Sequence, residues 1–189
     1  GAWVLADEVY RGLDQQGAGS TISVADLYDK GISTGSMSKA FSLAGLRLGW
    51  IAARRDLLEA VSIHRDYNTI SVGMIDDLLA AFALESSEAI LARNRAIIRG
   101  NLAILDGWVA SEPSISWVRP RSGTTALLRY AYPMGSEEFC LRLLRNTGVL
   151  FTPGSAFGME GTARIGYANA TSVLREGLAA VSGFLARLR

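Results

Sequence analysis

Two short apolar segments, each ending in charged or reactive side chains, most constrain how this chain can fold. The first ends at Asp7, and the second, over 32–35, lies just before Lys39. The second is typical of a short buried strand, and the first is an apolar run that also indicates a strand. A glycine-rich loop over 12–21 and a short helical piece over 24–28 lie between them, which predicts a strand, crossover, strand unit. Because such crossovers are right-handed, Asp7 and Lys39 should lie on one rim of the sheet, where ligands bind in open α/β sheets.

The pattern after Lys39 changes twice along the chain. A third strand over 46–53 should run antiparallel to its neighbour, since only a short turn separates the two. Apolar periodicity then predicts helices over 56–65 and 74–84. A long third helix should follow the capping residues at 86–88 and end at about residue 111. Short strands follow over 115–118, 124–130, 149–152 and 163–168, with helices over 136–146 and 171–188. This organisation is α/β followed by α+β, and we place the domains at 1–85 and 113–189, joined by a long helix at 86–112.

Lys39 lies among hydroxyl and small residues, with Arg47 eight positions further on. A lysine amine reacts with an aldehyde only as the free base, which a partly dry pocket and a neighbouring positive charge favour. The planar guanidinium of Arg47 also suits a phosphate, and the hydroxyls of Ser36 and Ser38 can donate to the same oxygens. A lysine beside phosphate-binding groups indicates pyridoxal 5′-phosphate, held as a Schiff base on Lys39.

The carboxylates after the first strand fit the same cofactor. Pyridoxal phosphate acts as an electron sink only while its ring nitrogen stays protonated, which requires a buried carboxylate as partner. Asp7 fits that role, and Tyr10, three residues later, can reach the phenolic oxygen of the ring. Glu8 is the alternative, since adjacent acids at a strand end are often only solvated, and the spacing to Tyr10 favours Asp7.

These elements resemble a known family. The residues D-E-V-Y at 7–10, S-M-S-K at 36–39 and Arg47 are similar to the class I/II aminotransferases, which are fold type I pyridoxal-phosphate enzymes. The segment T-A-R-I-G-Y-A-N at 162–169 resembles the family segment whose arginine binds the substrate α-carboxylate, which implies that role for Arg164. The resemblance implies a partial three-layer large domain, a small α+β C-terminal domain and a homodimer with the active site at the subunit interface.

The resemblance covers only the later half of the family. Members carry a phosphate-binding loop, an aromatic that stacks on the cofactor ring and an asparagine at its phenolic oxygen before the D-E-V-Y strand. None of these can be placed in the 189 residues. We therefore expect the chain to be the C-terminal part of a larger enzyme.

Arg164 lies within an apolar strand pattern, where an unpaired charge is costly, so the residue must find an anion. A structural acid is one candidate, and a substrate carboxylate, which matches the planar guanidinium, is the other. The preceding turn over 153–157 either lines the substrate pocket, as the resemblance implies, or is an ordinary tight turn.

Three functions remain open from the sequence. The first is transamination of an α-amino acid with a keto-acid acceptor, in which Lys39 also moves a proton, Asp7 keeps the cofactor nitrogen protonated and Arg164 holds the carboxylate. The second is elimination, decarboxylation or ring closure with the same cofactor, since one fold hosts many chemistries. The third is a C-terminal fragment with no activity of its own.

Composition excludes several other classes. The 19 basic and 18 acidic residues give a net charge of +1, so there is no electrostatic reason to expect nucleic acid or an anionic membrane as a partner. No apolar run approaches the roughly 20 residues that span a bilayer. One histidine, His64, and one cysteine, Cys140, cannot form a zinc-type metal site. A single cysteine and the lack of a leader predict a cytoplasmic protein with Cys140 in its core.

Overall fold

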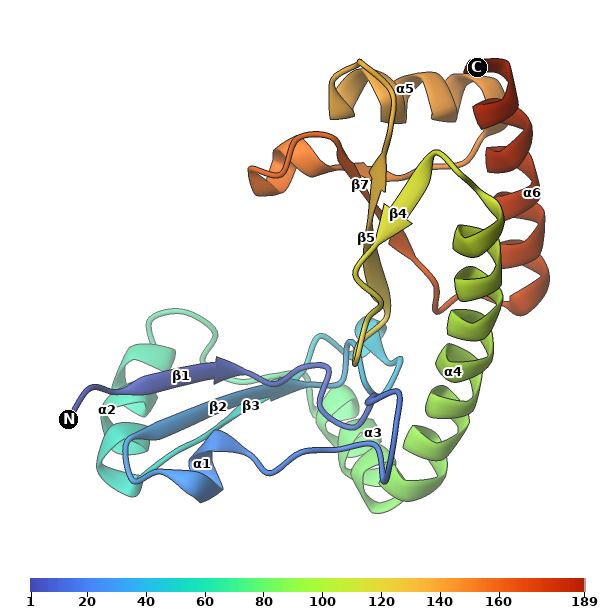
Figure 1. Ribbon diagram of the computed structural model, residues 1–189. Coiled ribbons are helices and arrows are strands. Elements are labelled where there is room, and N and C mark those ends of the chain that lie inside the picture. Colours follow the sequence, from blue (N-terminus) through green and yellow to red (C-terminus); the bar gives the residue numbers. More distant parts are fainter. Residues whose placement is uncertain (189) are drawn as a thin grey trace. The chain divides into compact units, whose positions relative to one another are not determined.

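The computed structural model describes residues 1–188, and the chain divides into two compact units (Figure 1). The first unit comprises Gly1–Arg95, and the second begins at Ala96. The division falls within α4 (Ser87–Ser111), the helix that the sequence assigns to a separate connecting segment. The domain limits at 85 and 112 stay predictions, and each unit is described below by itself.

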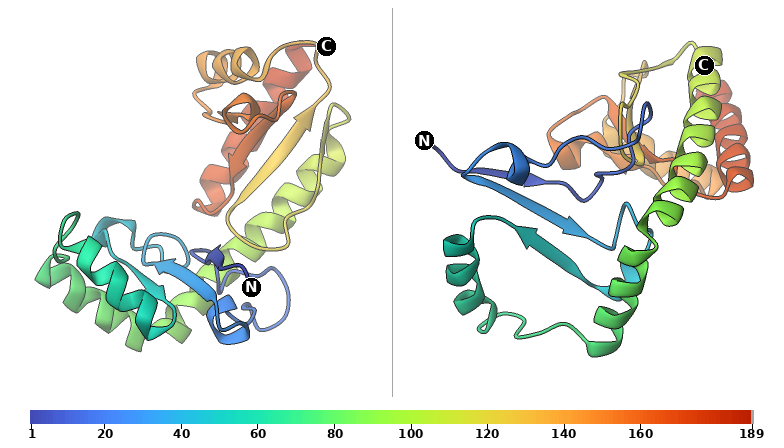
Figure 2. Two further views of the ribbon diagram at one scale, coloured as in Figure 1. Left: turned by 90° about the vertical axis from the view of Figure 1, so that its left-hand side faces the viewer. Right: turned by 90° about the horizontal axis from the view of Figure 1, so that it is seen from below.

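The sheet of the first unit has the predicted topology. It contains β1 (Val4–Asp7), β2 (Gly31–Ser36) and β3 (Gly49–Ala52) in the order β1-β2-β3. β1 is parallel to β2, and β3 is antiparallel to it. The right-hand view of Figure 2 shows the three strands side by side. Both outer strands therefore pair on one side only within the described residues.

Short connections and helices complete the first unit. Between β1 and β2 lies α1 (Val24–Leu27), whose N-cap Ser23 accepts a hydrogen bond from the Ala25 amide. A 3₁₀ turn, η1 (Ala44–Leu46), leads into β3. The remaining helices are α2 (Arg55–Arg65), α3 (Met74–Glu85) and the first part of α4. No residue of α2 is buried, and α3 buries only Ala80 and Ala83, so these helices cover little of the described sheet.

The second unit is a four-stranded antiparallel sheet with helices. Its strands lie in the order β4-β5-β7-β6, and its helices are the remainder of α4 with α5 and α6. The bounds are β4 (Ile115–Trp117), β5 (Thr125–Tyr130), α5 (Ser136–Thr147), β6 (Thr152–Pro153), η2 (Gly154–Phe157), β7 (Thr162–Gly166) and α6 (Thr171–Leu188). The strand expected over 149–152 is wrong in extent, because only Thr152 and Pro153 pair with β7.

The core of the second unit includes aromatic side chains that pack between its helices and its sheet. Phe139 of α5 stacks on Tyr130 of β5 with ring centroids 4.2 Å apart and meets Phe184 of α6 edge-on at 5.7 Å. α6 lies beside the part of α4 that belongs to this unit (Figures 1 and 2), and Trp108 Nε1 donates to Ser182 Oγ at 2.9 Å. Cys140 is buried as expected, and burial raises the pKa of its thiol to about 11.

In the described part of the chain, no helix is both long and apolar enough to cross a membrane. Among residues 1–188, no group of three or more histidine, cysteine, aspartate or glutamate side chains is arranged to hold a metal ion.

Candidate active site

The carboxyl ends of β1 and β2 lie on one rim of the first unit's sheet. Asp7 is the last residue of β1 and pairs in register with Thr34 of β2. The Glu8 amide donates to Thr34 O at 2.8 Å, which continues the ladder beyond the strand. The Ala40 amide donates to Val9 O at 3.2 Å and joins the segment after β2 to the segment after β1. The predicted placement of Asp7 and Lys39 at the same rim is thus confirmed.

Asp7 is oriented by two short-range hydrogen bonds. Its Oδ1 accepts from the Val9 amide at 3.2 Å and from Thr34 Oγ1 at 3.5 Å. The expectation of a buried carboxylate is wrong for the described residues, because Asp7 is exposed. The physical reason is that β1 is an outer strand of a three-stranded sheet, so nothing described packs over its free edge. One oxygen of an oriented, exposed carboxylate remains available to a ligand.

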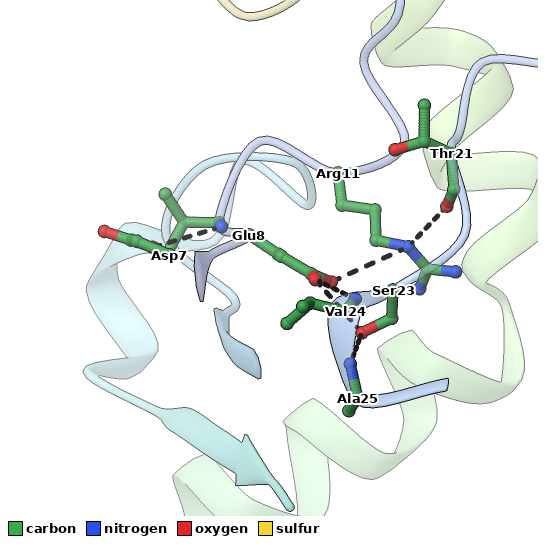
Figure 3. Close-up of polar contacts among 8 residues, drawn as sticks. Asp7, Glu8, Arg11, Thr21, Ser23, Val24 and Ala25 are labelled. Atoms are coloured by element: carbon green, nitrogen blue, oxygen red, sulfur yellow. Dashed lines mark hydrogen bonds and ion pairs between the residues drawn. The ribbon is translucent and has the colours of Figure 1, made fainter. Parts of the chain in front are cut away.

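Glu8, the alternative to Asp7, is fully engaged within the fold (Figure 3). Its Oε1 accepts from the Val24 amide at 2.8 Å and from Ser23 Oγ at 3.1 Å, at the N-terminus of α1. Arg11 lies 3.8 Å from Oε2 and donates from Nε to Thr21 O at 2.9 Å. Glu8 therefore ties the crossover to the end of β1.

The charge of Glu8 is stabilised by these contacts. Partial burial raises the pKa of its carboxyl, but hydrogen bonds from the Val24 amide and from the hydroxyls of Ser33 and Ser23, with the positive charge of Arg11, outweigh burial and hold the pKa below its ordinary value. A carboxylate held in this way is an anchor of the loop, which leaves Asp7 as the acid that can meet a ligand.

Lys39 is an exposed residue in a tight turn, and its neighbours Met37, Ala40 and Phe41 are buried. Met37 is 0% exposed and Ala40 is 3% exposed, so the residues near Lys39 anchor the turn in the unit's small core. The turn closes through hydrogen bonds from Ser42 N to Lys39 O at 3.1 Å and from Leu43 N to Met37 O at 2.9 Å. Ser42 has a φ of 58°, a conformation that costs a side-chain-bearing residue free energy and is concentrated at functional sites.

The predicted phosphate-binding residues flank this turn. Ser36 is the last residue of β2, and its Oγ accepts from the Ser38 amide at 3.2 Å, which leaves the Ser36 hydroxyl proton free to be donated. Arg47 follows η1 with a φ of 50°, and its Nη1 donates to Ala44 O at 2.7 Å. The guanidinium is exposed and keeps its other donors for an anion. This donor set fits a phosphate, although the roles of Ser36, Ser38 and Arg47 stay predictions.

Tyr10 lies in the turn that follows β1 and is partly buried. Its carbonyl accepts from the Leu13 amide at 3.1 Å, which holds the backbone of this turn, while Leu13 is 1% exposed. The turn therefore presents Tyr10 at the same strand end as Asp7. Contact between its hydroxyl and a cofactor ring stays a prediction.

Arg164 belongs to β7 of the second unit. Its Nη2 donates to Thr152 Oγ1 at 3.2 Å, and its Cζ lies 4.8 Å from the centroid of the Phe157 ring. Phe157 closes the turn over 153–157, so this turn shapes the surroundings of Arg164. Within the described residues Arg164 forms no salt bridge with an acid, which disfavours a structural carboxylate as its anion.

Sequence reasoning missed one residue of the first unit. Asn94, on α4, is 5% exposed, and its Nδ2 donates to Ala40 O at 2.8 Å, directly after Lys39. The signal was present, because a polar residue interrupts the apolar stripe of this helix. Such a residue is buried only when a specific partner satisfies it.

Comparison with known proteins decides the family. The model of the family described as aminotransferase class I and II matches residues 1–181. The chain belongs to this family.

Three relatives show how far the likeness extends. A PLP-dependent aminotransferase from Streptococcus suis 89-1591 is 42% identical, with a TM-score of 0.95 over 100% of this chain and 50% of that protein. Capreomycidine synthase of Streptomyces vinaceus is 37% identical over 155 residues, or 82% of this chain and 40% of that protein. The PLP-dependent cyclase OrfR is 32% identical, with a TM-score of 0.89 over 97% of this chain and 50% of that protein.

These likenesses confirm the predicted fold class, which is the mixed α/β fold of PLP-dependent aminotransferases. The similarity covers only part of the length of each relative. The chain spans 40% to 50% of the length of these three proteins.

Proposed function

We propose that the protein is a pyridoxal-phosphate-dependent aminotransferase, which acts on an α-amino acid with a keto-acid acceptor and binds its cofactor covalently through Lys39. The observation that carries the proposal is the joining of the two strand ends, where the hydrogen bond from Ala40 N to Val9 O brings the segments of Lys39 and Asp7 together. Family membership over residues 1–181 supports the choice of cofactor.

Each of the proposed site residues has a chemical role that suits its surroundings. Pyridoxal phosphate, when bound, supplies an electron sink for the pair released when the Cα–H bond of the amino acid breaks. Lys39, once it is a free-base amine, would take that proton from Cα and deliver it to C4′ of the cofactor. Asp7, oriented through Oδ1, holds the proton on the ring nitrogen.

Binding of the anionic groups falls to other residues. The hydroxyls of Ser36 and Ser38 and the guanidinium of Arg47 bind the phosphate, where charge-assisted hydrogen bonds are strongest. Arg164 binds the substrate carboxylate, and its stacking against Phe157 holds the guanidinium plane in place. Tyr10 donates to the phenolic oxygen of the ring.

Ring closure is the second candidate function. Two of the three relatives described above are a cyclase and a synthase, at 32% and 37% identity. Removal of the Cα proton by Lys39 would open either reaction, so the residues of this chain serve both. Analysis of products from a panel of amino acids, with and without a keto-acid acceptor, separates them, because only transamination requires the acceptor.

The protein is also proposed to work as a homodimer, as the family resemblance implies. The exposed apolar side chains of the first unit support this proposal, because a surface of this kind is suited to a protein interface.

The two lysines of the chain allow a direct test of the function. Lys39→Ala should lower turnover by at least roughly a thousandfold, since it removes both the covalent attachment and the proton-transfer group, while some cofactor stays bound without a covalent link. The matched control is Lys30→Ala, because the only other lysine, Lys30, donates to Gly1 O and lies outside the proposed site. Full activity of Lys39→Ala would contradict the proposal.

A further inference from the structure

Asn94 is a buried polar residue that contacts the turn carrying Lys39. It lies on the part of α4 that belongs to the first unit and is 5% exposed. Its Nδ2 donates to the carbonyl of Ala40 at 2.8 Å, across 54 residues of sequence. A buried carbonyl without a donor is costly, so this bond is the reason that the helix carries an amide here.

Arg93 fixes the orientation of that amide. Its Nε and Nη2 donate to Asn94 Oδ1 at 3.1 and 2.9 Å. A guanidinium can only donate, so Oδ1 must face Arg93 and Nδ2 must face the carbonyl. The donor aimed at Ala40 is therefore defined by its own neighbour.

The backbone directly after Lys39 is thus held on two sides. The Ala40 amide donates to Val9 O at 3.2 Å, at the end of β1, and the Ala40 carbonyl accepts from Asn94 on α4. Ala40 itself is 3% exposed, so its side chain has no room to shift. Two elements that are remote in sequence together set the position from which the Lys39 side chain extends.

We propose that Asn94 is a positioning residue for Lys39. By holding the Ala40 carbonyl, it keeps the turn closed, so that the Lys39 amine meets the aldehyde carbon of pyridoxal phosphate in a reactive geometry. The inference rests on the proposed function, because it concerns the lysine that function assigns. Asn94 lies on α4, outside the ends of β1 and β2 and outside the sequence motifs that contain the other proposed site residues.

Asn94→Asp is the sharpest variant, since it keeps the shape and replaces the donor with an acceptor that faces the Ala40 carbonyl. Its matched control is Asn101→Asp. Asn101 lies seven residues further along α4, is 0% exposed and donates from Nδ2 to Tyr167 O at 2.9 Å in the second unit. The two substitutions remove similar bonds, but only the first affects the lysine turn.

The first measurement needs no cofactor. Hydrogen exchange of the backbone amides over 37–43 should become roughly tenfold to hundredfold faster in Asn94→Asp, because the orphaned carbonyl lowers the cost of opening the turn. Exchange there should be unchanged in Asn101→Asp. Arg93 is exposed, and Arg93→Met removes the two hydrogen bonds that orient the Asn94 amide. This variant should give a smaller increase in exchange over 37–43. It replaces Asn94→Asp in the experiment if that variant does not fold.

The second measurement uses pyridoxal phosphate. The fraction of bound cofactor that becomes attached to Lys39 on borohydride reduction should fall several-fold in Asn94→Asp and stay at the wild-type value in Asn101→Asp. A wild-type protein with no such attachment overturns the proposed function and this inference with it. The inference fails, while the proposed function stands, if the cofactor attaches normally in the wild type but Asn94→Asp leaves either the exchange rate or the attached fraction unchanged.

Discussion

The two units of the chain differ in how completely they cover their apolar side chains. Among the described residues, the first contains six of the 25 buried hydrophobic residues and 18 of the 26 large hydrophobic residues that are exposed. The second contains the other 19 buried residues and only eight exposed ones. The second unit therefore has a core of its own, whereas the first carries the proposed site on a scaffold that leaves most of its large apolar side chains uncovered.

The shape of each sheet explains this difference. In the second unit, α5 and α6 pack on strands whose alternating residues point inward, such as Ala126, Leu128 and Tyr130. In the first unit the sheet has three strands with two free edges, and Leu5 of β1 is 68% exposed. The α3 helix adds an apolar stripe whose members, Leu78 and Phe82, are 70% and 68% exposed.

The largest expected effect compares one leucine from each unit. Leu143→Ala should lower the free energy of unfolding of the second unit by about 3 kcal/mol, because a fully buried leucine leaves a cavity. At concentrations where the chain is monomeric, Leu78→Ala should change stability by no more than about 0.5 kcal/mol, since that side chain is then in solvent. Urea unfolding followed by far-UV circular dichroism measures both. Equal losses would show that the units do not differ as described.

An intermediate effect is expected on association. The chain should self-associate through the exposed surface of its first unit, as free sheet edges and apolar stripes promote. The double variant Leu78→Lys, Phe82→Lys should weaken association at least roughly tenfold, about 1.4 kcal/mol, in sedimentation experiments. Val173→Lys, at an exposed position of the second unit, is the control and should have no effect. A monomeric wild-type chain would show that the apolar surface is not a contact surface.

The smallest effect concerns the anchor of the crossover. At pH 7, Glu8→Gln should destabilise the first unit by about 1 kcal/mol, because hydrogen bonds to a carboxylate are stronger than those to an amide. The pKa of Glu8 lies below its ordinary value of 4.5, so the stabilising contribution is complete above that pH and is lost as the pH falls through the folded-state pKa.

The difference between wild type and Glu8→Gln should therefore disappear in acid. Glu59→Gln is the control, since Glu59 forms an exposed pair with Arg55 on α2, and such pairs contribute little. A difference that persists undiminished at low pH would contradict the role of the charge.

Much of the fold could be predicted from local patterns. The apolar run that ends at Asp7 indicated β1, and the short run before Lys39 indicated β2. The apolar stripe of α4 indicated that this helix ends near Ser111. These signals depend on residues close in sequence. The strand over 149–152 was misplaced, since pairing with β7, and not apolar content, decides that only Thr152 and Pro153 join the sheet.

The site could be predicted less completely, for a physical reason. The placement of Asp7 and Lys39 on one rim could be predicted, because a strand, crossover, strand unit makes β1 and β2 parallel. The exposure of Asp7 could not follow, because it depends on which strands lie beside β1. Asn94 could not be assigned a partner, because its bond to Ala40 joins residues 54 positions apart.

The central claim is that Lys39 is the residue that binds pyridoxal phosphate, and one measurement tests it most directly. The protein is incubated with pyridoxal phosphate, reduced with borohydride, digested and analysed by mass spectrometry. With only two lysines in the chain, the label should be found on the peptide that contains Lys39 and not on the one that contains Lys30. A label confined to Lys30, or divided equally between the two, would contradict the account.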